Sequence, residues 1–302
     1  MEKENLKEGV DDYSILSLDD FIGSAEMYSE VGKIFREIAN ANLFRVAGSE
    51  PDKSYLFYGP PGTGKTHLVD CMYWELFQQN RYFGLKEYSI GTHGTAFINV
   101  GSVNLQKFFD EGKKGLDQGK FGGIIYKFDE CDVILTQREE SKRSHKEDEK
   151  LLSTLMINLQ RIHNDRTNEF VFFMTNFEGA LDAAATRVGR IDKYLKFNLP
   201  DYESRKRLFQ YEVTKINNRS KYRVIKNYNL DTLAEISDGM NNAEISDISR
   251  RAVKNKIHSF LQVGGDKMID FNKMGVRQGE LETEILALKK ERGKKEKRIG
   301  FI

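Results

Sequence analysis

The sequence has few of the residues that mark disulfide-bonded, metal-binding or membrane-spanning proteins. Only two of its 302 residues are cysteines, Cys71 and Cys131, and they lack the spacing of a zinc site or a disulfide framework. No apolar run approaches about 18 residues, and the N-terminal residues contain no apolar core of a signal peptide. These absences predict a cytoplasmic protein with no membrane span.

A strong charge of either sign is also missing. The sequence has 47 Lys and Arg against 46 Asp and Glu, a net charge of +1, so there is no global attraction to nucleic acid or to an anionic membrane. Such binding would need a local patch, and the basic run at residues 289–298 is the candidate for nucleic acid, acidic lipid or acidic protein. Hydrophobic residues, at 39%, are numerous enough for a sizeable core.

Short apolar segments alternate with helix-length polar or amphipathic ones through the first two thirds of the chain. This alternation predicts crossover units and a parallel sheet with helices on both faces, an α/β fold. Residues 27–38 carry apolar side chains at helical spacing, and the mixed-charge run 136–150 is expected to be a solvated loop. The predicted strands are residues 54–58, 96–100, 123–128 and 170–174.

The pattern changes after Pro200, where only helical periodicity remains and predicts a small all-helical domain. A short amphipathic helix is expected near the C-terminus, around Leu281, Ile285 and Leu288. The expected organisation is a flexible N-terminus at 1–17, an αβα domain at 18–200, a helical domain at 201–262 and a polar, basic C-terminal extension at 263–302.

The most specific motif is Gly-Pro-Pro-Gly-Thr-Gly-Lys-Thr at residues 59–66, between a predicted strand and a predicted helix. The glycines allow backbone N–H groups to converge on phosphate oxygens, and the helix N-terminus adds partial positive charge. Lys65 is expected to reach the β- and γ-phosphates, and the Thr66 hydroxyl to ligate Mg²⁺. We expect nucleotide contacts from Pro61, Gly62, Thr63, Gly64, Lys65 and Thr66, with His67 packed nearby.

Two acids, Asp129 and Glu130, follow the predicted strand 123–128, some 60 residues after the glycine-rich motif. Alone they could be ordinary loop residues, but at this position they predict a metal-holding acid and a general base. Asp129 would hold the Mg²⁺ ion and Glu130 would polarise the attacking water. Lys127 lies within the same strand, where we expect only that its stem snorkels at a sheet edge or packing boundary.

In order and spacing, the segments 59–66, 128–132, 174–176 and 180–192 resemble the AAA family of ATPases. The similarity runs from about residue 18 to 262 and is greatest to the branch with proteasomal ATPases, FtsH-type proteases and Cdc-type segregases. The resemblance implies a P-loop αβα domain followed by a small helical lid. It also implies Mg²⁺-dependent hydrolysis of ATP by a closed ring of identical subunits, a hexamer in this family.

The resemblance assigns further residues. Asn176 matches the polar residue that orients water and senses the γ-phosphate. Arg187 and Arg190 match two arginines that enter the neighbouring subunit's site, although each could instead form a surface salt bridge. The residues matching adenine-reading or lid segments are Asp20, Ile22, Gly23, Asn242 and Ala243, with Asn242 in place of a family glycine.

The substrate is less defined than the nucleotide. Family members that thread peptides carry an aromatic residue in a pore loop, and Phe108 and Phe109 match that place or pack inside the domain. The leading expectation is remodelling or unfolding of a protein substrate. Two alternatives stay open: an ATP-dependent nucleic-acid motor or loader that uses the basic tail, and an assembly scaffold gated by nucleotide.

Overall fold

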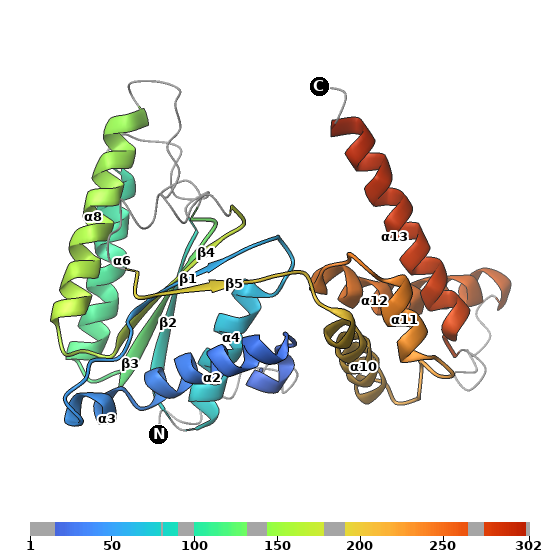
Figure 1. Cartoon of the computed structure of the whole chain (residues 1–302), viewed down its shortest axis with the longest axis horizontal. Helices are drawn as coiled ribbons and strands as arrows, with labels where there is room; N and C mark the ends of the chain where they lie inside the picture. The colour runs from blue at the N-terminus through green and yellow to red at the C-terminus, as the bar shows by residue number, and fades with distance from the viewer. Residues whose placement is uncertain are drawn as a thin grey trace. The chain divides into compact units, whose positions relative to one another are not determined.

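A computed structural model describes residues 16–79, 81–89, 100–131, 144–177, 191–264 and 275–299 (Figure 1). The chain divides into two compact units, with Met1–Phe21 and Glu26–Asn198 in unit 1 and Ile22–Ala25 and Leu199–Ile302 in unit 2. The main change of unit, at Leu199, lies close to the boundary expected after residue 200. Each unit has its own hydrophobic core.

Unit 1 is built on a five-stranded sheet with the order β2-β3-β4-β1-β5, and all of its pairings are parallel. The predicted parallel α/β architecture is therefore confirmed, and β1, β3 and β4 coincide with three predicted strands. The strands are β1 (Ser54–Tyr58), β2 (Phe83–Ser89), β3 (Gly123–Asp129), β4 (Glu169–Thr175) and β5 (Lys193–Lys196).

The two edge strands, β2 and β5, were not predicted. Among the described strands each pairs with one neighbour only. Each also mixes charged residues with apolar ones, so neither forms the continuous apolar run of a central strand. The predicted strand 96–100 falls outside the described residues except for Val100, which begins a helix. Part of the predicted loop 136–150 is also helical, because α8 starts at Ser144.

Helices cover both faces of this sheet (Figure 1). Helices α2 and α4 pack on one face and α6 and α8 on the other, as the membership of the two core clusters shows. The helices in the described part of this unit are the four just named, the short α3 and the 3-10 turn η1. Their bounds are η1 (Leu18–Asp20), α2 (Ala25–Ala39), α3 (Ala41–Val46), α4 (Lys65–Gln78), α6 (Val100–Asp117) and α8 (Ser144–Asn164).

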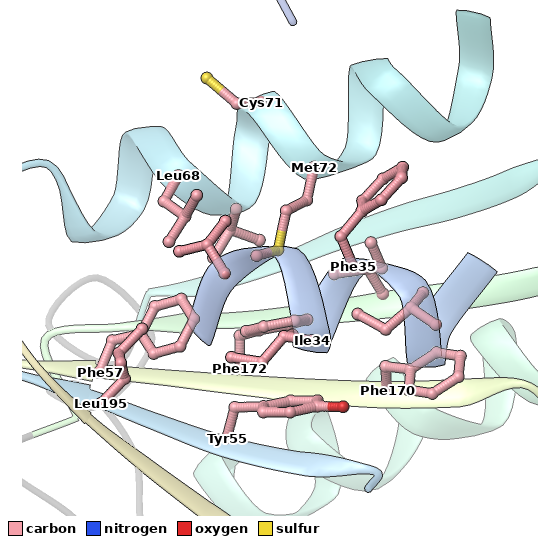
Figure 2. Packing of buried hydrophobic residues seen from close by; sticks show 14 of the residues in the cluster. Ile34, Phe35, Tyr55, Phe57, Leu68, Cys71, Met72, Phe170, Phe172 and Leu195 are labelled. Atoms are coloured by element: carbon pink, nitrogen blue, oxygen red, sulfur yellow. The ribbon is translucent and has the colours of Figure 1, made fainter. Parts of the chain in front are cut away.

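The central strands bury both faces, and alternate residues enter different cores. Tyr55 and Phe57 of β1 point toward α2 and α4, whereas Leu56 between them belongs to the core under α6 and α8. Figure 2 shows the first core, with Phe172 of β4 between the β1 aromatics and Met72 of α4. Aromatic stacking of Tyr55 on Phe172, with ring centroids 4.7 Å apart, helps to fix the register of β1 against β4.

Unit 2 consists of helices around one core, as predicted for residues 201–262. The structure adds the last helix to that core, because Leu281 and Ile285 are fully buried among the residues of the other helices. The segment predicted as a separate C-terminal extension thus contributes to the helical domain in its described part. The helices are α10 (Tyr202–Arg219), α11 (Leu230–Ile236), α12 (Asn242–Gly264) and α13 (Gln278–Ile299).

Candidate active site

The loop between β1 and α4 is shaped by three glycines in conformations that favour glycine. Gly59, Gly62 and Gly64 have φ values of 134°, 72° and 96°, respectively. Gly59 also lies against the chain that follows β5, where a Cβ atom would come within 2.0 Å of the Phe197 carbonyl oxygen. Gly64 is the N-cap of α4, so the loop delivers its last residues directly to the start of that helix.

Lys65, the first residue of α4, is 7% exposed and folds back over the loop. Its Nζ donates hydrogen bonds to the carbonyl oxygens of Gly59 and Pro60, both at 2.8 Å. The Thr63 hydroxyl donates to the same Pro60 carbonyl, also at 2.8 Å. The ammonium group is therefore held within the concave side of the glycine-rich loop and not in the solvent.

The second residue of α4 connects this loop to the end of β3. The Thr66 hydroxyl donates a hydrogen bond of 2.9 Å to Oδ2 of Asp129, and the Glu130 N–H donates one of 2.9 Å to Oδ1. Both carboxylate oxygens of Asp129 are therefore oriented. A hydroxyl and a carboxylate side by side are oxygen groups of the kind that Mg²⁺ prefers. Among the described residues, no group of three or more His, Cys, Asp and Glu side chains is placed to hold a metal ion.

Glu130 has an unusual backbone conformation for its residue type. Its φ of 53° is in the left-handed region, which costs about 1–2 kcal/mol for a residue with a side chain. The side chain of Glu130 is exposed, directly after the oriented Asp129. Strain of this kind persists where the surrounding structure enforces it, and it occurs often at active sites.

Sheet topology brings the remaining polar residue to the same edge. In the sheet β4 lies between β3 and β1, so the carboxyl ends of these three strands are neighbours. Asn176 follows the last residue of β4, Thr175, which is paired with Tyr58 at the end of β1. The chain after β1 enters α4 on one face of the sheet, and the next described helix after β3, α8, lies on the other face. This arrangement is typical of ligand-binding crevices in open α/β sheets.

Comparison with known proteins decides the family. Residues 55–199, which run from β1 through β5, match the family described as ATPase family associated with various cellular activities (AAA). Residues 55–199 of this chain belong to the AAA family of ATPases. ATP is therefore the nucleotide that the AAA domain binds.

The curated relatives of the chain include proteasome-activating nucleotidases. That of Methanopyrus kandleri is 31% identical over 254 residues, which are 80% of this chain and 52% of the relative. That of Saccharolobus solfataricus is 27% identical over 275 residues, which are 85% of this chain and 64% of the relative. A third, from Saccharolobus islandicus, is 30% identical over 233 residues, which are 73% of this chain and 55% of the relative. The chain thus spans between about half and two thirds of these relatives, and its resemblance to proteasomal ATPases is confirmed.

In the AAA domain the first turn of α4 also contacts the segment before α2. The His67 ring nitrogen Nε2 lies 3.2 Å from the Asp20 carbonyl oxygen and 3.6 Å from the Cys71 sulfur. The Asp20 carboxylate caps its own turn through the Ser17 N–H, at 2.7 Å. His67 therefore packs beside the loop, and the structure brings it together with Asp20.

Ile22 and Gly23 belong to unit 2, together with the predicted lid residues. The Asn242 side-chain amide donates to the Ile22 carbonyl at 3.1 Å, and the Gly23 carbonyl accepts from Ser204 at 3.2 Å and from Arg207 at 2.7 Å. The residue that replaces a family glycine thus has a contact of its own within the unit. Ala243, in the first turn of α12, is exposed.

Arg187 and Arg190 lie outside the described residues, but the chain directly after them is anchored. The Asp192 carboxylate accepts hydrogen bonds from the main-chain N–H groups of Lys53 and Ser54, at 2.8 and 2.9 Å. It also pairs with His163 at 2.8 Å. The hydrogen bond to Asp192 raises the pKa of His163. Burial alone would raise the pKa of Asp192, but the hydrogen bonds that its carboxylate accepts, with that of His163 the largest, keep this pKa below its usual value.

The structure decides between the two readings of Phe108 and Phe109. Both belong to α6, and both are buried in the core beneath α6 and α8, with ring centroids 5.5 Å and 5.7 Å from that of Phe128, respectively. Of the two alternatives, the structure therefore supports packing inside the domain and not a pore-loop contact at these two positions. Residues at helical spacing in a long amphipathic helix place their aromatic rings in the core.

Lys127 has a contact that the sequence did not reveal. It lies in a central strand and not at a sheet edge, its side chain is 6% exposed, and it forms ion pairs with Asp70 and Glu87. Burial alone would lower the pKa of Lys127, but the hydrogen bonds to these carboxylates outweigh burial and raise it. The expectation that its stem snorkels is replaced by a buried, paired charge. The available signal was an ionisable residue inside an apolar strand, which calls for a buried partner.

Proposed function

We propose that this chain hydrolyses Mg·ATP in a homo-oligomeric ring and uses the energy to remodel or unfold a protein substrate. The observation that carries the proposal is the hydrogen bond between Thr66 and Asp129, because it joins the phosphate-binding loop to the acid at the end of β3. A phosphate-binding loop alone provides binding, whereas the joined pair also provides a metal position. The protein substrate and the ring are proposed from the relatives and from the trans arginines.

The loop residues bind and orient the triphosphate. Phosphate oxygens replace the carbonyl oxygens of Gly59 and Pro60 as acceptors of Lys65, and the N–H groups at the start of α4 add further donors. A carbonyl and an anionic phosphate oxygen compete for the same ammonium, and the charged acceptor forms the stronger bond. Lys65 is therefore preorganised at low side-chain entropy cost, since it is already folded into the loop.

Thr66 and Asp129 are the residues that would hold Mg²⁺, which when bound neutralises part of the phosphate charge. Glu130 accepts a proton from the attacking water, and Asn176 orients that water from the neighbouring strand end. Arg187 and Arg190 would come from the adjacent subunit and stabilise the charge that develops on the transferred phosphoryl group.

The name of the relatives, proteasome-activating nucleotidase, supports a protein substrate over a nucleic acid. The basic run 289–298, the predicted contact for nucleic acid, also has a contact within unit 2, because Arg292 donates a hydrogen bond of 2.8 Å to the Gly239 carbonyl oxygen. The buried Phe108 and Phe109 leave peptide threading without a described contact residue. None of the helices in the described part of the chain is long and apolar enough to span a membrane.

Two inactive variants test both the chemistry and the sharing of sites. Glu130→Gln removes the base and Arg190→Ala removes the trans arginine, so each alone should lose at least about 100-fold in kcat while still binding ATP. In a ring with shared sites, an equal mixture should recover activity at about a quarter of its interfaces, where an intact Glu130 meets an intact Arg190.

The matched control is Glu203→Gln, a change to an exposed glutamate on α10, which should keep full activity. Co-assembly of the two inactive variants is checked with differently tagged subunits. A mixture that co-assembles and stays inactive would show that the sites are not shared. Full turnover by Glu130→Gln alone would remove Glu130 from the role of base.

A further inference from the structure

The ion pair of Lys127 with Asp70 lies directly beside the proposed metal site. Lys127 and Asp129 are two residues apart on β3, so their side chains leave the strand on the same face. Thr66 and Asp70 are four residues apart on α4, so they share one side of the helix on successive turns.

These two spacings create two parallel contacts between the strand and the helix. Asp129 accepts from Thr66 at 2.9 Å, and Lys127 donates to Asp70 at 2.5 Å. Two fixed points on successive turns determine both the rotation of α4 and its position along its own axis. One point alone would constrain the helix less against β3.

We propose that Lys127 and Asp70 are positioning residues that hold Thr66 within reach of Asp129 and thereby preorganise the Mg·ATP site. This inference rests on the proposed function and extends it to two residues outside the phosphate-binding motif. The pair touches neither the substrate nor the metal in this assignment. It acts by fixing the helix that carries Lys65 and Thr66.

The apolar contacts of α4 cannot fix its position with the same accuracy, and its hydrogen bonds through His67, Glu75 and Gln78 run to the segment before α2 and not to β3. Leu68, Val69 and Met72 pack against the sheet, but apolar contacts are non-directional and tolerate small sliding movements. A hydrogen bond between Thr66 and Asp129 does not, because lengthening it from 2.9 Å by about 1 Å breaks it. A directional, charge-assisted bond one turn away is therefore well suited to hold the register.

Lys127 has a second carboxylate partner that provides a matched control. Glu87 pairs with Lys127 from the neighbouring strand β2, whereas Asp70 pairs with it from α4. Each of Asp70→Ala and Glu87→Ala removes one negative charge from Lys127 and leaves the lysine paired with the other. Only Asp70→Ala removes the link to the helix. Alanine also favours the helix at position 70, so this variant should fold.

The expected result is a difference in the Mg²⁺ dependence of ATP hydrolysis. Asp70→Ala should raise the Mg²⁺ concentration for half-maximal activity at least fivefold and lower kcat, while its affinity for ATP in EDTA stays within twofold of wild type. Glu87→Ala should stay within twofold in both measurements. Asp70→Asn, which keeps an acceptor oxygen without the charge, should lie between wild type and Asp70→Ala. A purely structural role would lower thermal stability and leave the Mg²⁺ dependence unchanged.

Lys86→Met is a second control, because it breaks an ion pair of 2.7 Å with Glu111 that ties β2 to α6. It should leave the Mg²⁺ dependence unaltered. The double variant Asp70→Ala/Lys127→Met removes both partners of the link between β3 and α4 and should reproduce the Asp70→Ala shift. Equal Mg²⁺ dependence in wild type and in folded Asp70→Ala would overturn the inference while the proposed function stands. Absence of Mg²⁺-dependent hydrolysis in the wild type would instead overturn the proposed function.

Discussion

Replacing Asp192 with alanine should destabilise unit 1 more than removal of an ordinary surface carboxylate. One oxygen of this side chain, Oδ2, accepts the main-chain N–H groups of Lys53 and Ser54 at 2.8 and 2.9 Å. The Ser54 hydroxyl donates to the same oxygen at 2.9 Å, and His163 lies 2.8 Å away. The carboxylate thereby joins the chain before β5 to the start of β1.

The size of the effect follows from the burial of the two main-chain donors. Lys53 and Ser54 are 1% and 0% exposed, so water cannot replace the lost acceptor without local opening. A buried donor left unsatisfied costs about 1–3 kcal/mol, and two cost about 2–6 kcal/mol. Typical domains are stable by about 5–15 kcal/mol, so the loss should lower the melting temperature by roughly 5–20 °C.

Urea unfolding followed by tryptophan fluorescence measures this loss directly, because Trp74 is the only tryptophan and lies in α4 of unit 1. Asp192→Asn is the control, since its amide oxygen can still accept from Lys53 and Ser54, and it should cost less than half as much. The reasoning is refuted if Asp192→Ala unfolds within about 1 kcal/mol of wild type.

Three further predictions concern unit 1. Because the pKa of His163 is raised, its ion pair with Asp192 contributes its full stabilisation of the folded state below the usual histidine pKa of 6.5. That stabilisation is lost as pH rises through the raised pKa. Because the pKa of Asp192 is lowered, the contribution of its carboxylate to folding stability is present above pH 3.8 and is lost as pH falls through the lowered pKa. The difference in unfolding free energy between wild type and His163→Gln should therefore be greatest between pH 4 and 6.5 and shrink toward pH 9; a difference that grows with pH would contradict this. Gly59→Ala should lower the free energy of unfolding by about 2–5 kcal/mol and weaken ATP binding, because the new Cβ would lie 2.0 Å from the Phe197 carbonyl oxygen and the backbone φ is 134°. Undiminished affinity in a calorimetric titration with ATP would contradict this prediction. Arg161→Met should cost about 3 kcal/mol at pH 7, since it removes the bidentate partner of the fully buried Glu169, and thermal melts at lower pH should show a smaller loss as that carboxylate becomes protonated.

The sequence determined the features that depend on local spacing. The glycine-rich motif, the acids after an apolar strand and the three central strands could all be assigned from residue order, because central parallel strands are buried on both faces and read as continuous apolar runs. The same holds for the helical domain, whose apolar residues recur at helical spacing. These features were enough to predict the fold class and the family.

The tertiary structure decided the features that depend on neighbours distant in sequence. The edge strands β2 and β5 are strands because they pair with β3 and β1, respectively. Phe108 and Phe109 lie in a core, whereas the sequence alone could not decide between a core and a pore loop for them. Asp70 and Lys127 are 57 positions apart, so no local pattern links them. A charged residue within an apolar strand indicates that a buried partner exists. Only the packing of α4 on the sheet identifies that partner, because a buried ion needs a specific neighbouring group, which the composition of the sequence does not reveal.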